Sequence, residues 1–287
     1  MQVQTSNRTV YGAYLQTCQL LGLPFDLKPN TTLNEKLGIQ ESATLNQSEM
    51  PHVRYFCIGN GGHDVKSAGG KSIPVALQHR PSDPVPFSLI PFVLRQVNDD
   101  LTATQRQRYA LRRTKTYNGV NYFEYSARRI DITGVTAKMY YHEVDAGTTT
   151  VTEFTPDASN LSPVPPDLSN TGTNTATGDY LTASARLTLM MDDFDIAEII
   201  NAVKIIYGDE DLAIISEIGM CSGVDRVVST VTTGNATINF NEVVGCQIHS
   251  HMKGIHLLQF VKSHGNHQPH NGKYPSYLHD LPVAQPN

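Results

Sequence analysis

The sequence predicts an α+β fold with a β-rich core, a few helices and long extended arms. Segments of strand length that are rich in aromatic and β-branched residues outnumber the segments with a helical repeat. Polar stretches rich in Pro, Ser, Thr and Asn separate these segments and are too long to be ordinary connections. No period of about 20–50 residues repeats, which excludes solenoids and propellers.

Residues 1–50 are predicted to form an N-terminal helix followed by an extended arm. Residues 8–22 have an apolar stripe at spacings of three and four, which indicates an amphipathic helix. Residues 24–50 are mostly polar and show no sustained period, so we expect them to become ordered only on a neighbouring subunit. The apolar stripe of the helix consists of Val10, Tyr14, Cys18 and Leu21.

The predicted core domain covers residues 51–262 and opens with a strand at 52–58. Gly59-Asn-Gly-Gly62 follows, and its glycines predict a tight turn with positive φ angles. With His63 this segment resembles a phosphate-binding loop, but it has neither the lysine nor the helix that such a loop needs.

Proline interrupts the next part of the chain, where Leu89–Val97 is apolar and is predicted to be a strand or a bend around Pro91. Thr102 and Gln105 have the spacing of a capping box, which predicts a helix at 105–113. The basic residues of this region favour a solvated helix face, and contact with DNA is the alternative. They are Arg106, Arg108, Arg112, Arg113 and Lys115.

Residues 119–154 are predicted to be strands because they are rich in aromatic and β-branched residues. Asp145-Ala-Gly147 indicates a hairpin between the second and third strand. Residues 155–179 form a long polar loop within the core domain, and we expect it to be ordered by other subunits. The three strands are 121–125, 136–144 and 149–154.

The last part of the core is the most regular in pattern. A strand at 181–191 is followed by Asp192, which can cap a helix at 194–207, and Gly208 can end that helix. An apolar strand at 212–220 comes next, and we expect the helix and this strand to pack together as the centre of the fold. The apolar helix positions are Ile196, Ile199, Ile200, Val203 and Ile206.

The chain then continues in β pattern to its end region. Residues 227–233 and 236–244 flank Thr-Gly-Asn, which indicates another hairpin, and the β pattern runs on from 243 to 261. Residues 263–287 are polar, contain proline and histidine, and are predicted to be a C-terminal arm.

No catalytic, cofactor-binding or metal-binding residue is predicted, because none of the common enzyme motifs occurs. His249 and His251, with His256 nearby, resemble half of a metal site, although two histidines on one strand face often occur without a metal. The acidic clusters 192–195 and 208–211 fit a helix N-terminus and a solvated turn. The tail histidines are expected to be solvated: His264, His267, His270 and His279.

Composition excludes some classes of protein. The net charge of −5 does not fit a dedicated nucleic-acid binder. Charged residues are only 17% of the chain, which suits burial against other subunits and equally suits a neutral polar surface. The four cysteines lack paired spacing and are expected to be buried thiols of a protein made in a reducing cytoplasm. A signal peptide and a membrane span are not predicted.

Three stretches together resemble virion structural proteins of tailed bacteriophages, especially those with contractile tails. The resemblance spans about residues 50–250. It is carried by His52-Val-Arg-Tyr-Phe-Cys-Ile-Gly-Asn-Gly-Gly-His63, by Gln78-His-Arg80 with Asp100-Leu-Thr-Ala-Thr-Gln-Arg106, and by Gly178-Asp-Tyr-Leu-Thr-Ala-Ser184 with Ile214-Ile-Ser-Glu-Ile-Gly-Met-Cys-Ser-Gly-Val-Asp225.

The resemblance implies a structural role in the virion, and the neck, where connector proteins join portal to tail, is the preferred position. It implies a homo-oligomeric ring that contacts portal, connector or tail proteins, with arms lying across neighbouring copies. Genomic DNA would pass through the ring without sequence-specific binding. The chain would be made in the host cytoplasm, reside in the virion, and have neither enzymatic activity nor a membrane partner.

Other functions stay open at the level of sequence. A place in the baseplate, the collar or the capsid decoration would require the same kind of assembly surface. A receptor-binding or carbohydrate-binding module usually exposes clustered aromatic residues, and here the chain has no Trp and only Tyr274-Pro-Ser-Tyr277 as a candidate. A metal-dependent hydrolase would use His249 and His251.

Overall fold

The structure, a computed structural model, describes residues 6–41, 44–145, 147–160, 179–231, 237–257 and 277–280. The chain divides into two compact units. The main unit consists of residues 1–130 and 191–274, and the small unit of residues 131–190 and 275–287. This division into units differs from the predicted one into 1–50, 51–262 and 263–287, because the small unit interrupts the predicted core and the N-terminal residues belong to the main unit.

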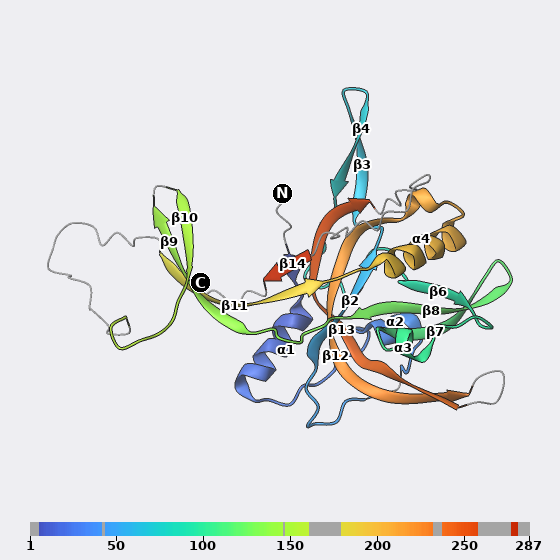
Figure 1. Ribbon diagram of the computed structural model, residues 1–287, viewed down its shortest axis with the longest axis horizontal. Coiled ribbons are helices and arrows are strands. Elements are labelled where there is room, and N and C mark those ends of the chain that lie inside the picture. The colour runs from blue at the N-terminus through green and yellow to red at the C-terminus, as the bar shows by residue number, and fades with distance from the viewer. Residues whose placement is uncertain are drawn as a thin grey trace, which may run out of the picture. The chain divides into compact units, whose positions relative to one another are not determined.

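The main unit is built on an eight-stranded antiparallel sheet, and the prediction of a β-rich chain with few helices is confirmed. Its strand order is β1-β13-β12-β2-β8-β6, with β5 paired to β2 and β7 paired to β8 (Figure 1). The strands are β1 (Ser6–Arg8), β2 (His52–Gly59), β5 (Leu89–Ile90), β6 (Val93–Gln96), β7 (Tyr109–Tyr117), β8 (Val120–Arg129), β12 (Ile214–Val231) and β13 (Thr237–Leu257).

Two further strands of the main unit form a separate ribbon that extends away from this sheet (Figure 1). They are β3 (His63–Ala68) and β4 (Lys71–Ala76). The helices of the described residues are α1 (Val10–Leu21), α2 (Leu33–Leu37), α3 (Ala103–Arg106) and α4 (Asp193–Tyr207), with a 3₁₀ turn, η1, at Glu210–Leu212. None of them is long and apolar enough to span a membrane.

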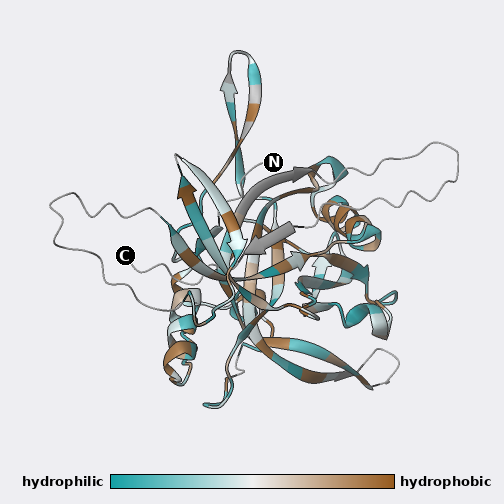
Figure 2. Ribbon diagram, turned by 60° about the vertical axis from the view of Figure 1, so that its left-hand side comes forward, coloured by the Kyte–Doolittle hydropathy of each residue, from teal (hydrophilic) through white to brown (hydrophobic). Residues whose placement is uncertain are grey.

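The predicted second hairpin of the core is the long β12–β13 pair, which is paired from Ile214 to Val231 with register shifts at three places. Strand β12 ends at Val231 and β13 begins at Thr237. The predicted Thr-Gly-Asn turn between them lies outside the described residues. Hydrophobic and hydrophilic residues alternate along the free end of this ribbon (Figure 2).

Residues 24–41 pack on the main unit and are not an extended arm. Phe25 is buried beside α1, and the leucines of α2 join the central core of β2, β7, β12 and β13. The amide of Asn34 accepts from the Cys246 backbone N–H and donates to the Val243 carbonyl, both at 2.8 Å. The mostly polar composition of this segment concealed a leucine pair, Leu33 and Leu37, at a spacing of four, which is enough to bury one short helix.

Helix α1 is confirmed, but its buried face differs from the predicted stripe. Gly12, Leu15 and Cys18 are buried, whereas Val10 and Leu21 are more than half exposed. The reason is close packing on β13: a Cβ at Gly12 would lie 2.9 Å from Cδ2 of His249. The helix therefore turns its smallest residue, which no hydrophobic pattern marks, toward the sheet.

The predicted helix at 105–113 is wrong. The capping box of Thr102 and Gln105 forms, but α3 ends after one turn and β7 begins at Tyr109. Strand β7 pairs with β8 through Asn118 and Gly119, both at positive φ, the geometry of a two-residue hairpin turn. Asn-Gly between two aromatic and β-branched runs was the signal in the sequence that would have predicted this hairpin.

Helix α4 begins and ends as predicted. Asp192 and Asp195 form a reciprocal capping box, and Gly208 adopts the left-handed conformation at the C-cap. One of its buried residues, Ala202, packs with Leu94 of β6 and Tyr122 of β8. The short 3₁₀ turn η1 leads the chain from the helix into β12, and the expectation that this helix and strand pack together stays a prediction.

The small unit is a four-stranded antiparallel sheet with the order β10-β9-β11-β14. The predicted hairpin at Asp145 to Gly147 is confirmed, with Asp145 paired to Thr148. Most of the predicted polar loop, residues 161–178, lies outside the described residues, as does most of the C-terminal arm. The strands are β9 (Ala137–Asp145), β10 (Thr148–Glu153), β11 (Tyr180–Leu189) and β14 (Tyr277–Asp280).

Candidate functional site

The predicted glycine turn wraps a buried carboxylate. Glu217 of β12 is 1% exposed, and the backbone N–H groups of Gly61 and Ser88 donate to it at 3.0 Å each. None of the three glycines has positive φ, so the predicted turn geometry is wrong. They are needed for close approach instead: a Cβ at Gly62 would lie 2.7 Å from the Ser216 carbonyl oxygen.

A histidine completes the shell around this carboxylate. His79 Nε2 lies 2.7 Å from Glu217 and its Nδ1 lies 3.2 Å from Asp83. Burial opposes ionisation of Glu217, but the bonds from His79, Ser88 and Phe87 outweigh it and hold its pKa below the ordinary value. An acid–histidine–acid series resembles catalytic machinery, but here all hydrogen-bonding capacity of Glu217 is directed at the protein. The cluster fastens the loop of residues 79–88 to β12.

The two candidate metal histidines of β13 lie in different surroundings. His251 stacks on His79 with ring centroids 3.7 Å apart, and burial lowers its pKa to about 4, so the ring is neutral. His249 lies against Gly12 of α1. The side chain of His256 is outside the described set, as are His264, His267 and His270. Within the described residues no group of three or more His, Cys, Asp or Glu side chains is arranged to hold a metal ion.

The acidic cluster at the start of α4 is part of the framework. Asp195 is fully buried, accepts from Tyr109 at 2.6 Å, and pairs with Arg108 and Arg128 at 3.0 and 2.8 Å. Burial raises the pKa of Asp195, and the Arg128 guanidinium and the Tyr109 hydroxyl oppose that shift. The cluster at 208–211 is exposed, as predicted for a solvated turn.

The basic run lies on α3 and β7 and not on one helix face. Arg106 and Arg112 both pair with Asp100, at 3.2 and 3.1 Å, and Arg113 pairs with Glu124 at 2.6 Å. Four of the five basic residues are thus neutralised within the main unit, counting Arg108. The remaining residue of the run, Lys115, forms no ion pair within the described residues. Its ammonium lies 4.8 Å from the Tyr117 ring centroid.

Lys115 lies at a pocket of about 350 Å³, here called the basic pocket, formed by α2, residues 85–91, β7 and the end of α4. Its walls combine apolar side chains, such as Leu37, Val85 and Ile206, with polar ones that include Glu124 of β8, the partner of Arg113. Within the described residues, neither Lys36 nor Lys115 forms an ion pair. The pocket therefore offers apolar surface beside free positive charge. Its aromatic residues are Phe87, Tyr117 and Tyr207, and its cations are Lys36, Arg113 and Lys115.

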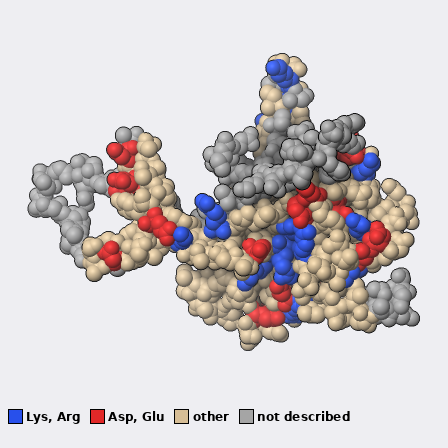
Figure 3. Space-filling model, in the orientation of Figure 1, with Lys and Arg blue, Asp and Glu red and all other residues tan. Residues whose placement is uncertain are grey.

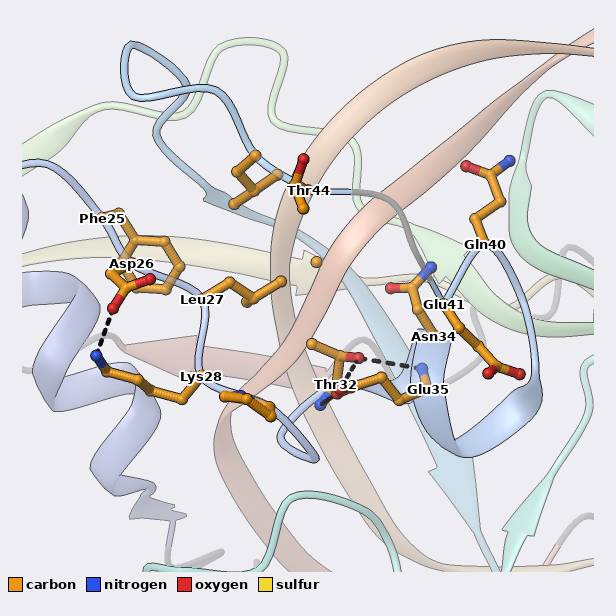
Figure 4. Close-up of a pocket in the computed structure, with 13 residues that line it drawn as sticks. Phe25, Asp26, Leu27, Lys28, Thr32, Asn34, Glu35, Gln40, Glu41 and Thr44 are labelled. Carbon is orange, nitrogen blue, oxygen red and sulfur yellow. Dashed lines mark hydrogen bonds and ion pairs between the residues drawn. The ribbon is translucent and has the colours of Figure 1, made fainter.

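A second pocket, of about 230 Å³, lies between residues 25–29, the start of α2 and residues 40–45 (Figure 4). Several of its polar groups are engaged within the protein. Glu35 accepts from the Thr32 hydroxyl at 2.7 Å, and Lys28 pairs with Asp26 at 2.5 Å. Asn34 is bonded to the backbone of β13.

The small unit exposes most of its sheet. No residue of β9 or β10 is buried, and Val151, Leu181 and Met139 are 52%, 56% and 43% exposed. Residues 131–190 hold seven of the chain's 27 acidic residues and two of its 22 basic residues, which accounts for the whole net charge of −5. Acidic side chains on this sheet are visible in Figure 3. An antiparallel sheet ordinarily packs one face on a core, so this one is suited to covering by another protein.

Comparison with protein families gives one match, over residues 1–279, to a family described as "Family of unknown function (DUF7208)". The chain belongs to this family. Neither a curated protein nor a solved structure matches it.

For this member of DUF7208, sequence reasoning found residues that the structure uses for folding and missed those that are available to partners. The glycine loop, the acidic helix start and the arginine run were all noticed, and each lies in a buried network. Lys36, Tyr207 and the exposed sheet were not singled out. The exposed sheet had a signal in the concentration of negative charge in residues 131–190, whereas no local pattern marked Lys36 or Tyr207.

Proposed function

We propose that this chain is a structural protein of a tailed-bacteriophage particle, most specifically a neck protein that forms a ring between portal and tail. The observation that carries the proposal is the exposed sheet of the small unit, which has large apolar side chains and no buried residue in two of its strands. Exposed apolar surface of this kind marks a place where another protein binds. In a ring, neighbouring copies would provide that cover.

Two further features support assembly within a virion made in the host cytoplasm. All four cysteines are buried free thiols, as suits a protein folded under reducing conditions. Many charged residues of the main unit are paired with one another, as Arg108 is with Asp195 and Arg113 with Glu124, which lowers the cost of desolvating them against portal, connector or tail proteins. The acidic small unit fits a ring through which genomic DNA passes without sequence-specific binding.

The proposal treats the protein as a non-enzyme without a cofactor or a metal. The carboxylate of Glu217, which belongs to the set that resembles catalytic machinery, has both oxygens hydrogen-bonded to backbone N–H groups or to His79. A site of chemistry would need at least one such group directed at solvent.

The test is a nonsense mutant of the encoding phage, propagated with and without a suppressor host. Without the chain we expect DNA-filled heads and free tails that do not join, and mass spectrometry of normal particles should detect the chain. Normal, infectious particles made without the chain would refute the proposal. Joined particles with a defective baseplate or collar would refute the neck position and support the alternative virion positions.

A further inference from the structure

Among the described residues, two surfaces are opposite in charge and both include exposed apolar side chains. One is the basic pocket of the main unit, and the other is a face of the small-unit sheet. Each belongs to a single unit, and each can be described without reference to the other.

The sheet face is defined by strand register. Met139 is paired with Ala183 and Tyr141 with Leu181, and cross-strand partners share one face of a sheet. Alternation along β9 places Glu143 and Asp145 on that same face. We call it the Met139–Leu181 face. It carries two exposed apolar side chains at one end and two exposed carboxylates at the other.

The carboxylates of this face are available to a partner. Within the described residues neither Glu143 nor Asp145 forms an ion pair, whereas Glu153, on the opposite face, is paired with Lys138 at 2.8 Å. The Tyr141 hydroxyl donates to Asp179 at 2.8 Å, which holds the ring on the sheet.

The basic pocket has the complementary features. Tyr207 and Phe87 are 42% and 51% exposed at its rim, and the apolar part of its lining would accept a leucine or a methionine. Lys36 and Lys115 are exposed at the same pocket and lack a carboxylate partner within the described residues. Opposite charges at the rim of an apolar contact fix its register and speed its formation.

We propose that the Met139–Leu181 face of one copy binds the basic pocket of a second copy. Leu181 and Met139 cover the aromatic rim, and Glu143 and Asp145 face Lys36 and Lys115. The two surfaces differ, so the contact is heterologous: each copy gives its sheet to one neighbour and receives a sheet from another. Such a contact closes into a ring when its rotation divides a full turn. The inference deepens the proposed function by naming the interface, and it rests on that function only for the ring.

Variants with one added surface cysteine test the contact directly. The four native cysteines are buried and do not compete for oxidation. Leu181→Cys and Tyr207→Cys are prepared as separate chains with tags of different mass, mixed at high concentration and oxidised. A mixed disulfide between the two variants is expected. The control pair is Leu181→Cys with Val65→Cys, which places an equally exposed cysteine on the β3–β4 ribbon, and it should give no more than background.

Charge reversal tests the register. Lys115→Glu and Glu143→Lys should each weaken association about tenfold in sedimentation velocity, and the chain that carries both changes should regain most of the loss. Lys66→Glu, the same change on the β3–β4 ribbon, should have no effect. Circular dichroism on each variant confirms that the fold is retained.

Three results would overturn the inference. The first is a yield of mixed disulfide no higher than that of the control pair. The second is an association constant that the charge reversals leave unchanged. The third is a chain with both added cysteines that forms only an intramolecular disulfide. That result would mean that the sheet binds the pocket of its own chain. None of these results bears on whether the chain is a virion protein, because the nonsense mutant tests that separately.

Discussion

At the scale of single residues, buried charge determines how the main unit is fastened. Glu217, Asp195 and Glu242 are all essentially inaccessible, and each accepts several hydrogen bonds from backbone or side-chain donors. Glu242 accepts from the backbone N–H of Leu111, a buried residue at φ 58, and so helps to hold this strained backbone conformation in β7. Removing one partner from such a group costs far more than the group contributes when it is satisfied.

The buried histidine of β13 makes the fold sensitive to acid. Burial lowers the pKa of His251 to about 4, below its ordinary value of 6.5, so the folded chain binds this proton less readily than the unfolded chain. Stability is complete above pH 6.5 and is lost progressively as the pH falls to about 4, by about 3 kcal/mol. His251→Phe, which keeps a ring against His79, should flatten the denaturant-derived free energy of unfolding over that range.

The remaining acid sensitivity has a different origin and a different range. Glu217 has a pKa below its ordinary value of 4.5, so its contribution is present above that pH and is lost below it. His251→Phe should therefore leave the loss below pH 4 in place. An unchanged slope between pH 6.5 and 4 in this variant would contradict the assignment to His251.

The glycine loop predicts a steric effect at one position. Gly62→Ala would place a Cβ 2.7 Å from the Ser216 carbonyl oxygen, where backbone must move. We expect a loss of about 1–3 kcal/mol in the free energy of unfolding, measured by urea titration. Gly69→Ala, at φ +59 with no atom within 4 Å of its Cβ, is the control for backbone strain alone. Gly62→Ala should cost more than this control, and an equal cost would mean that the loop is loosely packed.

At the scale of elements, local signals set the ends of helices and turns but did not set their packing. The capping boxes of α3 and α4 and the Asp145 hairpin follow directly from side-chain chemistry within four residues. The length of α3 does not, since the strand pairing of β7 with β8 ends the helix after one turn. A capping box starts a helix, but tertiary pairing decides how far the helix continues.

Helix α4 allows a matched test of which face is buried. Ile199 is fully buried, whereas its neighbour Ile200 is half-buried. Ile199→Ala should cost about 2–5 kcal/mol in the free energy of unfolding, and Ile200→Ala should cost clearly less. Thermal and urea unfolding of the two variants measure the difference. Equal costs would show that the helix is rotated from the orientation described here.

At the scale of the whole molecule, the buried core and the exposed sheet belong to different units. The main unit has its own aromatic and aliphatic core, while strands β9 and β10 contribute no buried residue. Residues 131–190 account for the net charge of the chain, so under our proposal this segment would govern electrostatic contact with other copies.

The polar segment between β10 and β11 gives a prediction at this scale. Deleting residues 158–175, which contain few apolar side chains, should leave the unfolding midpoint of the chain unchanged and block incorporation into particles. Unfolding in urea and particle yield in a complementation assay are the two measurements. If the deletion lowers the midpoint, the segment belongs to the core of the small unit.

The sequence by itself determined what depends on neighbours along the chain. Strand content, two hairpins, the ends of α4 and the free thiols follow from propensity, turn chemistry and cysteine spacing, which act over a few residues. Tertiary structure alone decided that Gly12 faces β13 and that the Asn34 amide is hydrogen-bonded to the backbone of β13. It likewise decided that the arginines of the basic run form ion pairs with carboxylates of the main unit. It also decided that Lys36, Lys115 and Tyr207 meet at one pocket. Several of these contacts join residues more than 200 positions apart, and their geometry is set by sheet register, which no local pattern specifies.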